Sequence, residues 1–157
     1  MGLGYDAHRF AAGRLLILGG VEVPHEAGLA GHSDADVVAH AVADALLGAA
    51  GLGDIGYLFP ENDPAYAGAD SMQLLAQVSG QARRAGFRVA NVDVVVVCET
   101  PRLAAHRERM AANLAAALGI DSSQVNVKGT TTEGMGFEGR GEGIAAMAVC
   151  LLESVQG

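Results

Sequence analysis

Residues Arg88–Cys98, with the sequence RVANVDVVVVC, contain the clearest strand signal of the chain. A run this rich in valine predicts a β-strand. A helix is expected next, from Pro101 to Leu118, because proline suits the first turn of a helix and a glycine follows its last residue. A second strand is expected at Gln124–Gly129, where valine alternates with polar residues. A strand, a helix and a strand in this order predict two parallel strands joined by a crossover helix.

The segments around this unit predict an α+β protein. A capping-box pattern, Ser33 with Asp36, precedes a helix expected over Ala35–Ala50. Ile144–Leu152 is apolar throughout, and its short length favours a strand over a helix. Further expected elements are strands at Gly2–Phe10, Leu15–Leu18 and Val21–Val23 and a helix at Asp70–Gly86. We therefore expect one domain over residues 1–157, with a small mixed sheet and three helices on one face.

The composition limits the class of protein. The chain has 157 residues, of which 50% are hydrophobic, so it is long enough for one core and too apolar for disorder. Eighteen acidic against ten basic residues give a formal charge of −8, which disfavours binding to nucleic acid. The sequence has no signal-peptide pattern and no apolar run near the roughly 20 residues of a membrane span. We expect a cytoplasmic protein, not bound to membranes, with Cys98 and Cys150 reduced.

Asp6, His8 and His40 form the first candidate site. Residues at positions i and i+2 of a strand point to the same face, so Asp6 and His8 could share one metal ion. His40 is a polar residue in the middle of an apolar helix and is a candidate third ligand. Two histidines and one carboxylate with an open fourth position are typical of a catalytic zinc. The alternative is a chance pair together with an ordinary core histidine.

Three further motifs combine polar side chains with glycine. His32 and Ser33 precede a helix, where backbone N–H groups and the helix dipole favour an anion. Asp54 lies in a glycine-flanked turn, and Thr130–Thr132 with Glu133 could bind a phosphate and a hard cation. Each motif alone also has a structural explanation, as a helix cap, a turn or a strand end. Together they predict a ligand with several phosphates that metal ions hold, because the chain is acidic.

The order of these motifs resembles that of one enzyme family. The motifs are GYDAHRF at residues 4–10, HSDAD at 32–36, VAHA at 38–41, DALLGAA at 44–50, GDIG at 53–56, FP at 59–60, TTTE at 130–133 and GRGEGI at 139–144. They are similar to those of the 2-C-methyl-D-erythritol 2,4-cyclodiphosphate synthases of the non-mevalonate isoprenoid pathway. The resemblance implies a four-stranded mixed sheet with helices on one face. It also implies a homotrimer whose sheets pack around a threefold axis, with active sites between subunits.

The reaction that the resemblance implies is an intramolecular phosphoryl transfer. The 2-phosphate of 4-diphosphocytidyl-2-C-methyl-D-erythritol 2-phosphate attacks the β-phosphate, CMP leaves and a cyclic diphosphate forms. Positioning and charge neutralisation dominate the catalysis of such transfers. This reaction therefore needs metal ions and a shaped site, and no nucleophile from the protein.

The resemblance also assigns roles by position. Asp6, His8 and His40 are similar to the zinc ligands, and Glu133 to the ligand of a Mg²⁺ or Mn²⁺ ion. Asp54, Thr131 and Glu133 match catalytic positions. The matching substrate positions are His32, Ser33, Asp54 and Gly56 for the methylerythritol phosphate, and Pro101, Arg102, Leu103, Ala104, Gly129, Thr130 and Thr131 for the cytidine side, with Phe137 and Arg140 in addition. Arg140 and Glu142 match a pair near the threefold axis, where some members hold a prenyl diphosphate.

Two other functions compete with this one. A zinc hydrolase would use the open metal position to activate water and would need a general base near the triad, for which Asp54 is the free carboxylate. A trimeric binding protein would keep the metal only as a structural element. The products formed from the CDP-linked substrate separate the three possibilities.

Overall fold

The valine-rich stretch is an interior strand of the main sheet in the computed structural model, which describes residues 1–60 and 63–155. It forms strand β5 (Phe87–Val97), which pairs in parallel with β6 (Val125–Thr130). Helix α4 (Arg107–Leu118) lies between the two strands in sequence and packs against β6. The predicted strand–helix–strand crossover is confirmed.

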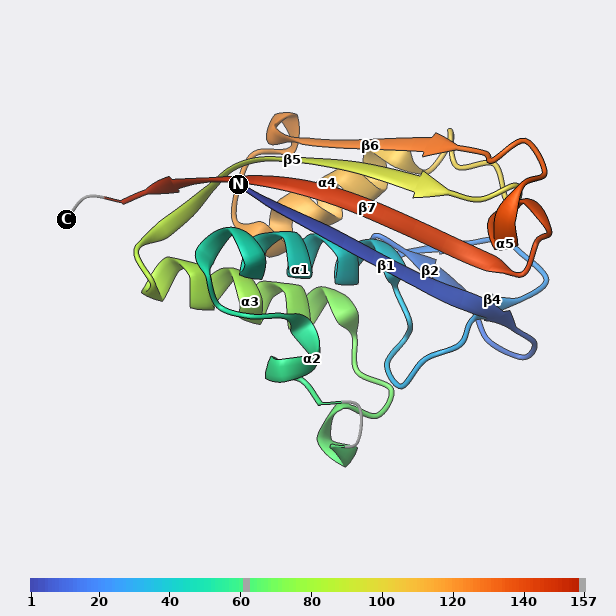
Figure 1. Cartoon of the computed structure of the whole chain (residues 1–157), viewed down its shortest axis with the longest axis horizontal. Helices are drawn as coiled ribbons and strands as arrows, with labels where there is room; N and C mark the ends of the chain where they lie inside the picture. Colours follow the sequence, from blue (N-terminus) through green and yellow to red (C-terminus); the bar gives the residue numbers. More distant parts are fainter. Residues whose placement is uncertain (61–62, 156–157) are drawn as a thin grey trace.

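The main sheet is mixed, and its five strands have the order β4-β1-β7-β5-β6 (Figure 1). β7 (Gly143–Ser154) lies between β5 and β1 (Gly2–Ala11) and runs antiparallel to both, which confirms the strand prediction for its segment. The expected number of four strands is one too low, because β4 (Gly28–Leu29) pairs with the end of β1. Two residues are too few for a periodic pattern, so this strand has no signal in the sequence.

Three helices cover one face of the main sheet, as predicted. Helix α1 (Val37–Ala50) packs against β1 and β7, and α3 (Ser71–Arg84) packs against both α1 and α4. Figure 1 shows α1 and α3 together below the strands. No helix in the described ranges is long and apolar enough to cross a membrane. The remaining elements are short: the hairpin β2 (Leu16–Leu18) and β3 (Val21–Val23), the helices α2 (Ile55–Leu58) and α5 (Gly136–Gly139), and the 3₁₀ turns η1 (Pro64–Tyr66) and η2 (Ser122–Gln124).

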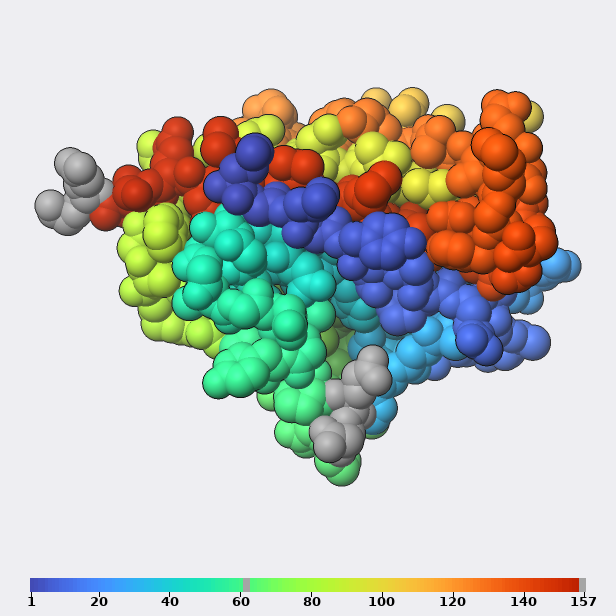
Figure 2. Space-filling model, in the orientation of Figure 1, coloured from blue at the N-terminus to red at the C-terminus, as the bar shows by residue number. Residues whose placement is uncertain are grey.

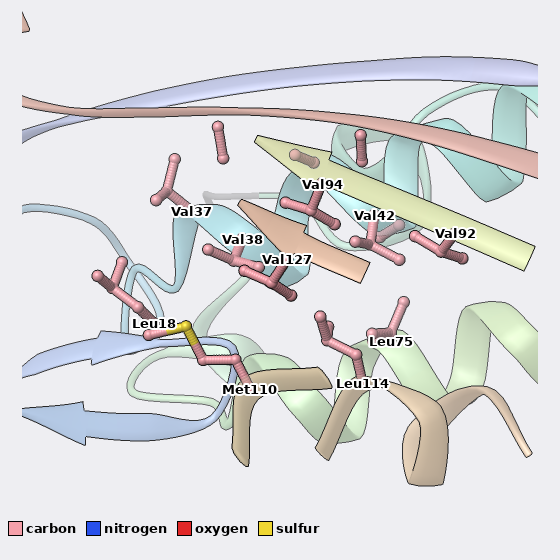
Figure 3. Close-up of a cluster of buried hydrophobic side chains, with 14 of the residues drawn as sticks. Leu18, Val37, Val38, Val42, Leu75, Val92, Val94, Met110, Leu114 and Val127 are labelled. Atoms are coloured by element: carbon pink, nitrogen blue, oxygen red, sulfur yellow. The ribbon is translucent and has the colours of Figure 1, made fainter. Parts of the chain in front are cut away.

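The hydrophobic core lies between these helices and the inner face of the sheet (Figure 3). Alternate residues of β5 and β6 point into it, as expected for strands with one face on a core. Each fully buried aliphatic side chain contributes roughly 1.5–3 kcal/mol. The residues of this cluster are drawn from every layer: Val92, Val94 and Val127 from the sheet, Val38 and Val42 from α1, Leu75 from α3, and Met110 and Leu114 from α4.

Two glycines let β1 lie directly against helix α1. A Cβ atom on Gly4 would stand 1.9 Å from the carbonyl oxygen of Ala41, and one on Gly2 would stand 2.1 Å from that of Ala45. No side chain fits at these distances, so the strand approaches the helix only because these residues are glycine. This close approach brings the middle of β1 next to the helix residue His40 and so prepares the candidate metal site.

Helix α1 begins two residues later than predicted, and its cap is Asp36 rather than Ser33. The Asp36 side chain is fully buried and accepts hydrogen bonds from the N–H groups of Val38 and Ala39. It also accepts from the N–H groups of Gly19 and Gly20 in the β2–β3 turn. The preceding Ala35 has a φ of 57°, which is incompatible with a right-handed helix. The capping-box prediction with Ser33 is therefore wrong.

Helix α4 also begins later than predicted, at Arg107 instead of Pro101. The segment between them forms a turn in which the His106 N–H donates to the carbonyl of Leu103. Leu103 is buried and lies beside Gly129 of β6. The packing of Leu103 against β6 keeps this segment from joining the helix. The segment instead lines a cavity that is described below.

The outer face of the sheet is uncovered within the single chain, and it is apolar along β1 and β7, whereas Asp93, Asn126 and Lys128 make it polar along β5 and β6. Along β7, buried residues alternate with Met147, Val149 and Leu151, which are 40–44% exposed. Leu3 and Tyr5 of the neighbouring β1 are also exposed. Figure 2 shows β7 and β1 at the surface of the strand layer. Such a contiguous apolar surface marks an interaction site.

Candidate metal centre and active site

Asp6, His8 and His40 come together as the sequence predicts. Asp6 and His8 extend from the same face of β1, and His40 comes from the first turns of α1. The His8 Nε2 atom lies 2.9 Å and the His40 Nδ1 atom 3.0 Å from Asp6 Oδ2, and the two nitrogens are 3.2 Å apart. Three potential ligand atoms within 4.8 Å of one another could hold one metal ion.

The electrostatics of the triad favour a bound cation. Burial alone would raise the pKa of Asp6, but the hydrogen bonds with His40 and His8 outweigh it and hold that pKa well below its usual value. Burial alone would lower the pKa of His40, yet the hydrogen bond with Asp6 and its negative charge raise it. The site therefore contains a carboxylate that stays ionised and attracts positive charge. One carboxylate with two imidazoles is a donor set that suits zinc.

A cavity of about 130 Å³ adjoins the triad. It is lined by the triad itself and by the predicted residues His32, Ser33 and Gly56, together with Asp44, Ile55, Phe59, Tyr66 and Leu74. The predicted residue Asp54 is not among the lining residues, and its side chain instead caps α2 by accepting from the Tyr57 N–H at 2.8 Å. Asp44, which the sequence analysis does not single out, fixes the same turn by accepting from the Ile55 N–H at 2.8 Å. The structure thus places the three candidate metal ligands at the wall of a pocket that has both polar and apolar residues.

A second cavity, of about 300 Å³, opens where the parallel strands β5 and β6 end. All seven residues predicted for the cytidine side line it, namely Pro101, Arg102, Leu103, Ala104, Gly129, Thr130 and Thr131. Cys98, Glu99 and Arg107 complete the lining. Arg102 and Arg107 outnumber the one lining carboxylate, Glu99, so this cavity has a positive balance within an acidic chain. A pocket with this charge suits an anionic ligand.

The loop after β6 is held by Glu99, a residue that belongs to none of the motifs predicted from the sequence. The Glu99 carboxylate accepts from the N–H groups of Thr132 and Gly134, at 3.1 and 3.3 Å, and from the Thr132 hydroxyl. These bonds bracket Glu133, whose φ of 57° lies in the left-handed region. A non-glycine residue in this region is uncommon and marks a loop that its surroundings constrain.

The last predicted residues lie near the start of β7. Phe137 lines a third, open cavity together with His8, Phe10 and Glu142. Arg140 and Glu142 form an ion pair with a 2.6 Å separation between Nε and Oε1. Both side chains are more than half exposed, so solvent screens the pair and it contributes little to stability within one chain.

Comparison with known proteins gives a consistent result. The model of the YgbB family matches residues 1–153. The 2-C-methyl-D-erythritol 2,4-cyclodiphosphate synthase of Rubrobacter xylanophilus is 60% identical and aligns with 100% of this chain and 96% of its own length. The enzyme of the same name from Aromatoleum aromaticum is also 60% identical, over 97% of this chain and 92% of its own.

Solved structures agree with the sequence relatives. The bifunctional IspDF from Campylobacter jejuni superposes with a TM-score of 0.94 and 44% identity over 98% of this chain, which spans 42% of that longer protein. A CDP-bound 2C-methyl-D-erythritol-2,4-cyclodiphosphate synthase superposes with a TM-score of 0.88 and 34% identity, over 97% of this chain and 99% of that one. By sequence over its whole length and by fold, the chain belongs to the YgbB family.

Proposed function

We propose that this chain is a 2-C-methyl-D-erythritol 2,4-cyclodiphosphate synthase, which converts 4-diphosphocytidyl-2-C-methyl-D-erythritol 2-phosphate into the cyclic diphosphate and CMP. The observation that carries the proposal is the triad of Asp6, His8 and His40 at the wall of a pocket that contains His32 and Gly56. The names of relatives with 60% identity support the cyclic diphosphate product, and the CDP-bound structure supports a CDP-linked ligand.

The proposed metal ions are zinc and either Mg²⁺ or Mn²⁺. Asp6, His8 and His40 would hold the zinc with three protein ligands and leave a further position for the substrate. When bound, zinc would act as a Lewis acid that polarises a phosphate oxygen. Glu133 is an oxygen ligand of the kind that Mg²⁺ prefers, and the substrate phosphates would complete that second site.

The two cavities would bind the two ends of the substrate. His32, Ser33, Asp54 and Gly56 would hold the methylerythritol and its 2-phosphate. The larger cavity would hold the cytidine, with Arg102 beside the phosphates and Leu103 against the base. Thr131 would contact a phosphate through its hydroxyl. All of these residues except Asp54 line one of the two cavities, which supports their assignment, and Asp54 lies in the turn next to Ile55 and Gly56 of the smaller one.

The proposed step is a displacement within one substrate molecule. An oxygen of the 2-phosphate attacks the β-phosphorus, and a new P–O bond closes the ring. The bond from the β-phosphorus to the oxygen that it shares with the α-phosphate breaks, and CMP leaves with that oxygen. The residues of the chain bind, orient and neutralise the reacting phosphates, since two anions must meet within bonding distance.

The proposed assembly is a homotrimer formed by the outer faces of three sheets. The exposed apolar residues Leu3, Tyr5, Met147, Val149 and Leu151 support it, since they would otherwise remain in water. In such a trimer the pocket of the metal centre and the cytidine cavity of a neighbouring subunit would form one active site. A prenyl diphosphate near Arg140 and Glu142 and a cytoplasmic location stay predictions.

A product analysis tests the proposed function. The purified protein with zinc and Mg²⁺ is incubated with the CDP-linked substrate, and the ³¹P resonances are followed. We expect CMP and the cyclic diphosphate in equal amounts. Linear phosphates would instead identify a zinc hydrolase, and no turnover by the metal-loaded protein would leave only a binding function.

A further inference from the structure

The ring nitrogen of His40 that faces away from the triad is surrounded by hydroxyl groups. Its Nε2 atom lies 2.9 Å from the Ser71 hydroxyl and 3.3 Å from that of Ser33. Ser71 is the first residue of α3 and is 1% exposed, and Ser33 is 8% exposed. Water therefore has almost no access to this side of the imidazole, and the two serines determine its hydrogen bonding.

A count of protons fixes the direction of the bond between His40 and Ser71. The Ser71 hydroxyl donates to Asp34 Oδ1 over 2.5 Å, and a carboxylate can only accept. The hydroxyl has a single proton, so toward His40 it must act as the acceptor. The proton between these two residues therefore belongs to His40 Nε2.

Asp34 is itself held in place by the backbone. Its Oδ2 accepts from the Ser71 N–H at 3.2 Å, and its Oδ1 accepts from the Asp36 N–H at 3.2 Å. The N–H of Asp34 donates to the carbonyl of Ala69 just before α3. The carboxylate is thus anchored to both α1 and α3, and it can orient the hydroxyl between them.

With a proton fixed on Nε2, Nδ1 is the ring nitrogen whose lone pair a metal ion would take, in place of the proton that Nδ1 shares with Asp6 when no metal is bound. Nδ1 is the atom that lies 3.0 Å from Asp6 Oδ2 and 3.2 Å from His8 Nε2. A metal ligand needs its lone pair directed at the metal, and the partner of the other ring nitrogen determines which tautomer is present. Ser71 would thus keep His40 in the form that can bind a metal.

We propose that Ser71 and Asp34 are positioning residues of the metal centre, because they fix the tautomer and the ring orientation of His40. The proposal rests on the metal-binding part of the proposed function and is independent of the phosphoryl transfer. It also implies that the N-terminus of α3 contributes to metal affinity, although none of its residues is a ligand.

Zinc affinity of the full-length protein tests this proposal. Competition with a chromophoric chelator should show that Ser71→Ala binds zinc about 10–100-fold more weakly than wild type, the range typical for loss of an outer-shell partner. Asp34→Asn should weaken binding in the same direction. The matched control is Ser79→Ala, because Ser79 lies on the same helix, is 2% exposed and donates to the Leu118 carbonyl, away from the triad. Its zinc affinity should equal that of wild type.

A spectroscopic measurement reports the tautomer itself. In the zinc-loaded protein, long-range ¹H–¹⁵N correlations of the histidine rings should show a proton on His40 Nε2, and Co²⁺-loaded Ser71→Ala should have an altered visible spectrum. An unprotonated Nε2 would overturn the proposal. Zinc affinities of Ser71→Ala and Asp34→Asn within twofold of Ser79→Ala would also overturn it, as would a wild-type protein that binds no zinc. If Ser71→Ala does not fold, the zinc affinity of Asp34→Asn and the His40 tautomer in the wild-type protein still test the proposal. A protein that binds zinc but forms no cyclic product would overturn the proposed function and leave this proposal intact.

Discussion

His40 is the single ligand of the candidate metal centre that a helix contributes, so the centre depends on it to join α1 to β1. We predict that His40→Ala lowers the zinc content from about one ion per chain to near zero and reduces turnover by at least about 100-fold, because the metal loses a ligand. His40 is not part of the hydrophobic core, so its replacement should leave the fold intact. The oligomeric state should therefore not change. Elemental analysis and sedimentation measure both effects, and His106→Ala is the control. A His40→Ala protein with normal zinc content would refute the ligand assignment.

The two cysteines provide a second prediction at the residue scale. Burial raises the pKa of Cys98 and Cys150 to about 11, so at pH 8 only about one thiol in a thousand is ionised. The ionised form gains population only as the pH approaches that pKa. We therefore expect iodoacetamide at pH 8 to label the native protein at least about 100-fold more slowly than the unfolded chain. Mass spectrometry measures the rates, and equal rates would contradict the buried positions.

Single residues also show what a sequence can and cannot predict about a site. Asp6 and His8 are predictable as a pair because the two-residue period of a strand places both on one face. Ser71 and Asp34 are 37 positions apart and meet only because α3 packs against α1. Glu99 likewise acts on a loop more than 30 residues away. Supporting contacts of this kind depend on the tertiary fold and have no local pattern.

At the scale of elements, the contact between β1 and α1 determines where the metal centre forms. We predict that Gly4→Ala destabilises the protein by about 3 kcal/mol or more and weakens zinc binding, because the new methyl group would overlap the backbone of α1. The control is Gly48→Ala in α1, where nothing lies within 4 Å of the added atom. That change should stabilise the helix by up to about 1 kcal/mol. Denaturant unfolding measures both, and equal effects would contradict the described packing.

The loop after β6 provides a prediction for a second element. Glu99→Ala removes the acceptor of two N–H groups that bracket Glu133, whereas Glu99→Gln keeps one oxygen at the same place. We expect the Mg²⁺ concentration for half-maximal rate to rise about tenfold in the alanine variant, equivalent to about 1.4 kcal/mol, and to change little in the glutamine variant. Steady-state titration with Mg²⁺ measures this. The same Mg²⁺ dependence in all three proteins would show that Glu99 does not position the loop.

Element boundaries show where local patterns fail. The strand β5 and the crossover to β6 are predictable because valine density and alternation are local properties. The start of α1 is not predictable in this way, because hydrogen bonds from the distant Gly19 and Gly20 N–H groups hold Asp36 in the cap position. The start of α4 is set by the burial of Leu103 against β6. In both cases a tertiary contact overrides a local signal.

At the scale of the whole molecule, the outer sheet face explains why one chain would hold only part of an active site. We predict that Met147→Asp produces monomers. The substitution places a charge among the apolar residues of β1 and β7, and in a trimer each of the three subunits would have to bury that charge. Leu15→Asp is the control, because Leu15 is 63% exposed and lies outside the main sheet. Analytical ultracentrifugation measures the assembly. A trimeric Met147→Asp protein would place the interface elsewhere.

The proposed reaction joins two phosphates of one substrate molecule at the metal centre, without water as a nucleophile. The most direct test is to run the reaction in H₂¹⁸O with zinc and Mg²⁺ and to analyse both products by mass spectrometry. If the 2-phosphate is the nucleophile, CMP and the cyclic diphosphate form in equal amounts and neither contains ¹⁸O. A linear product that carries ¹⁸O would show that water attacks instead, and would contradict the account.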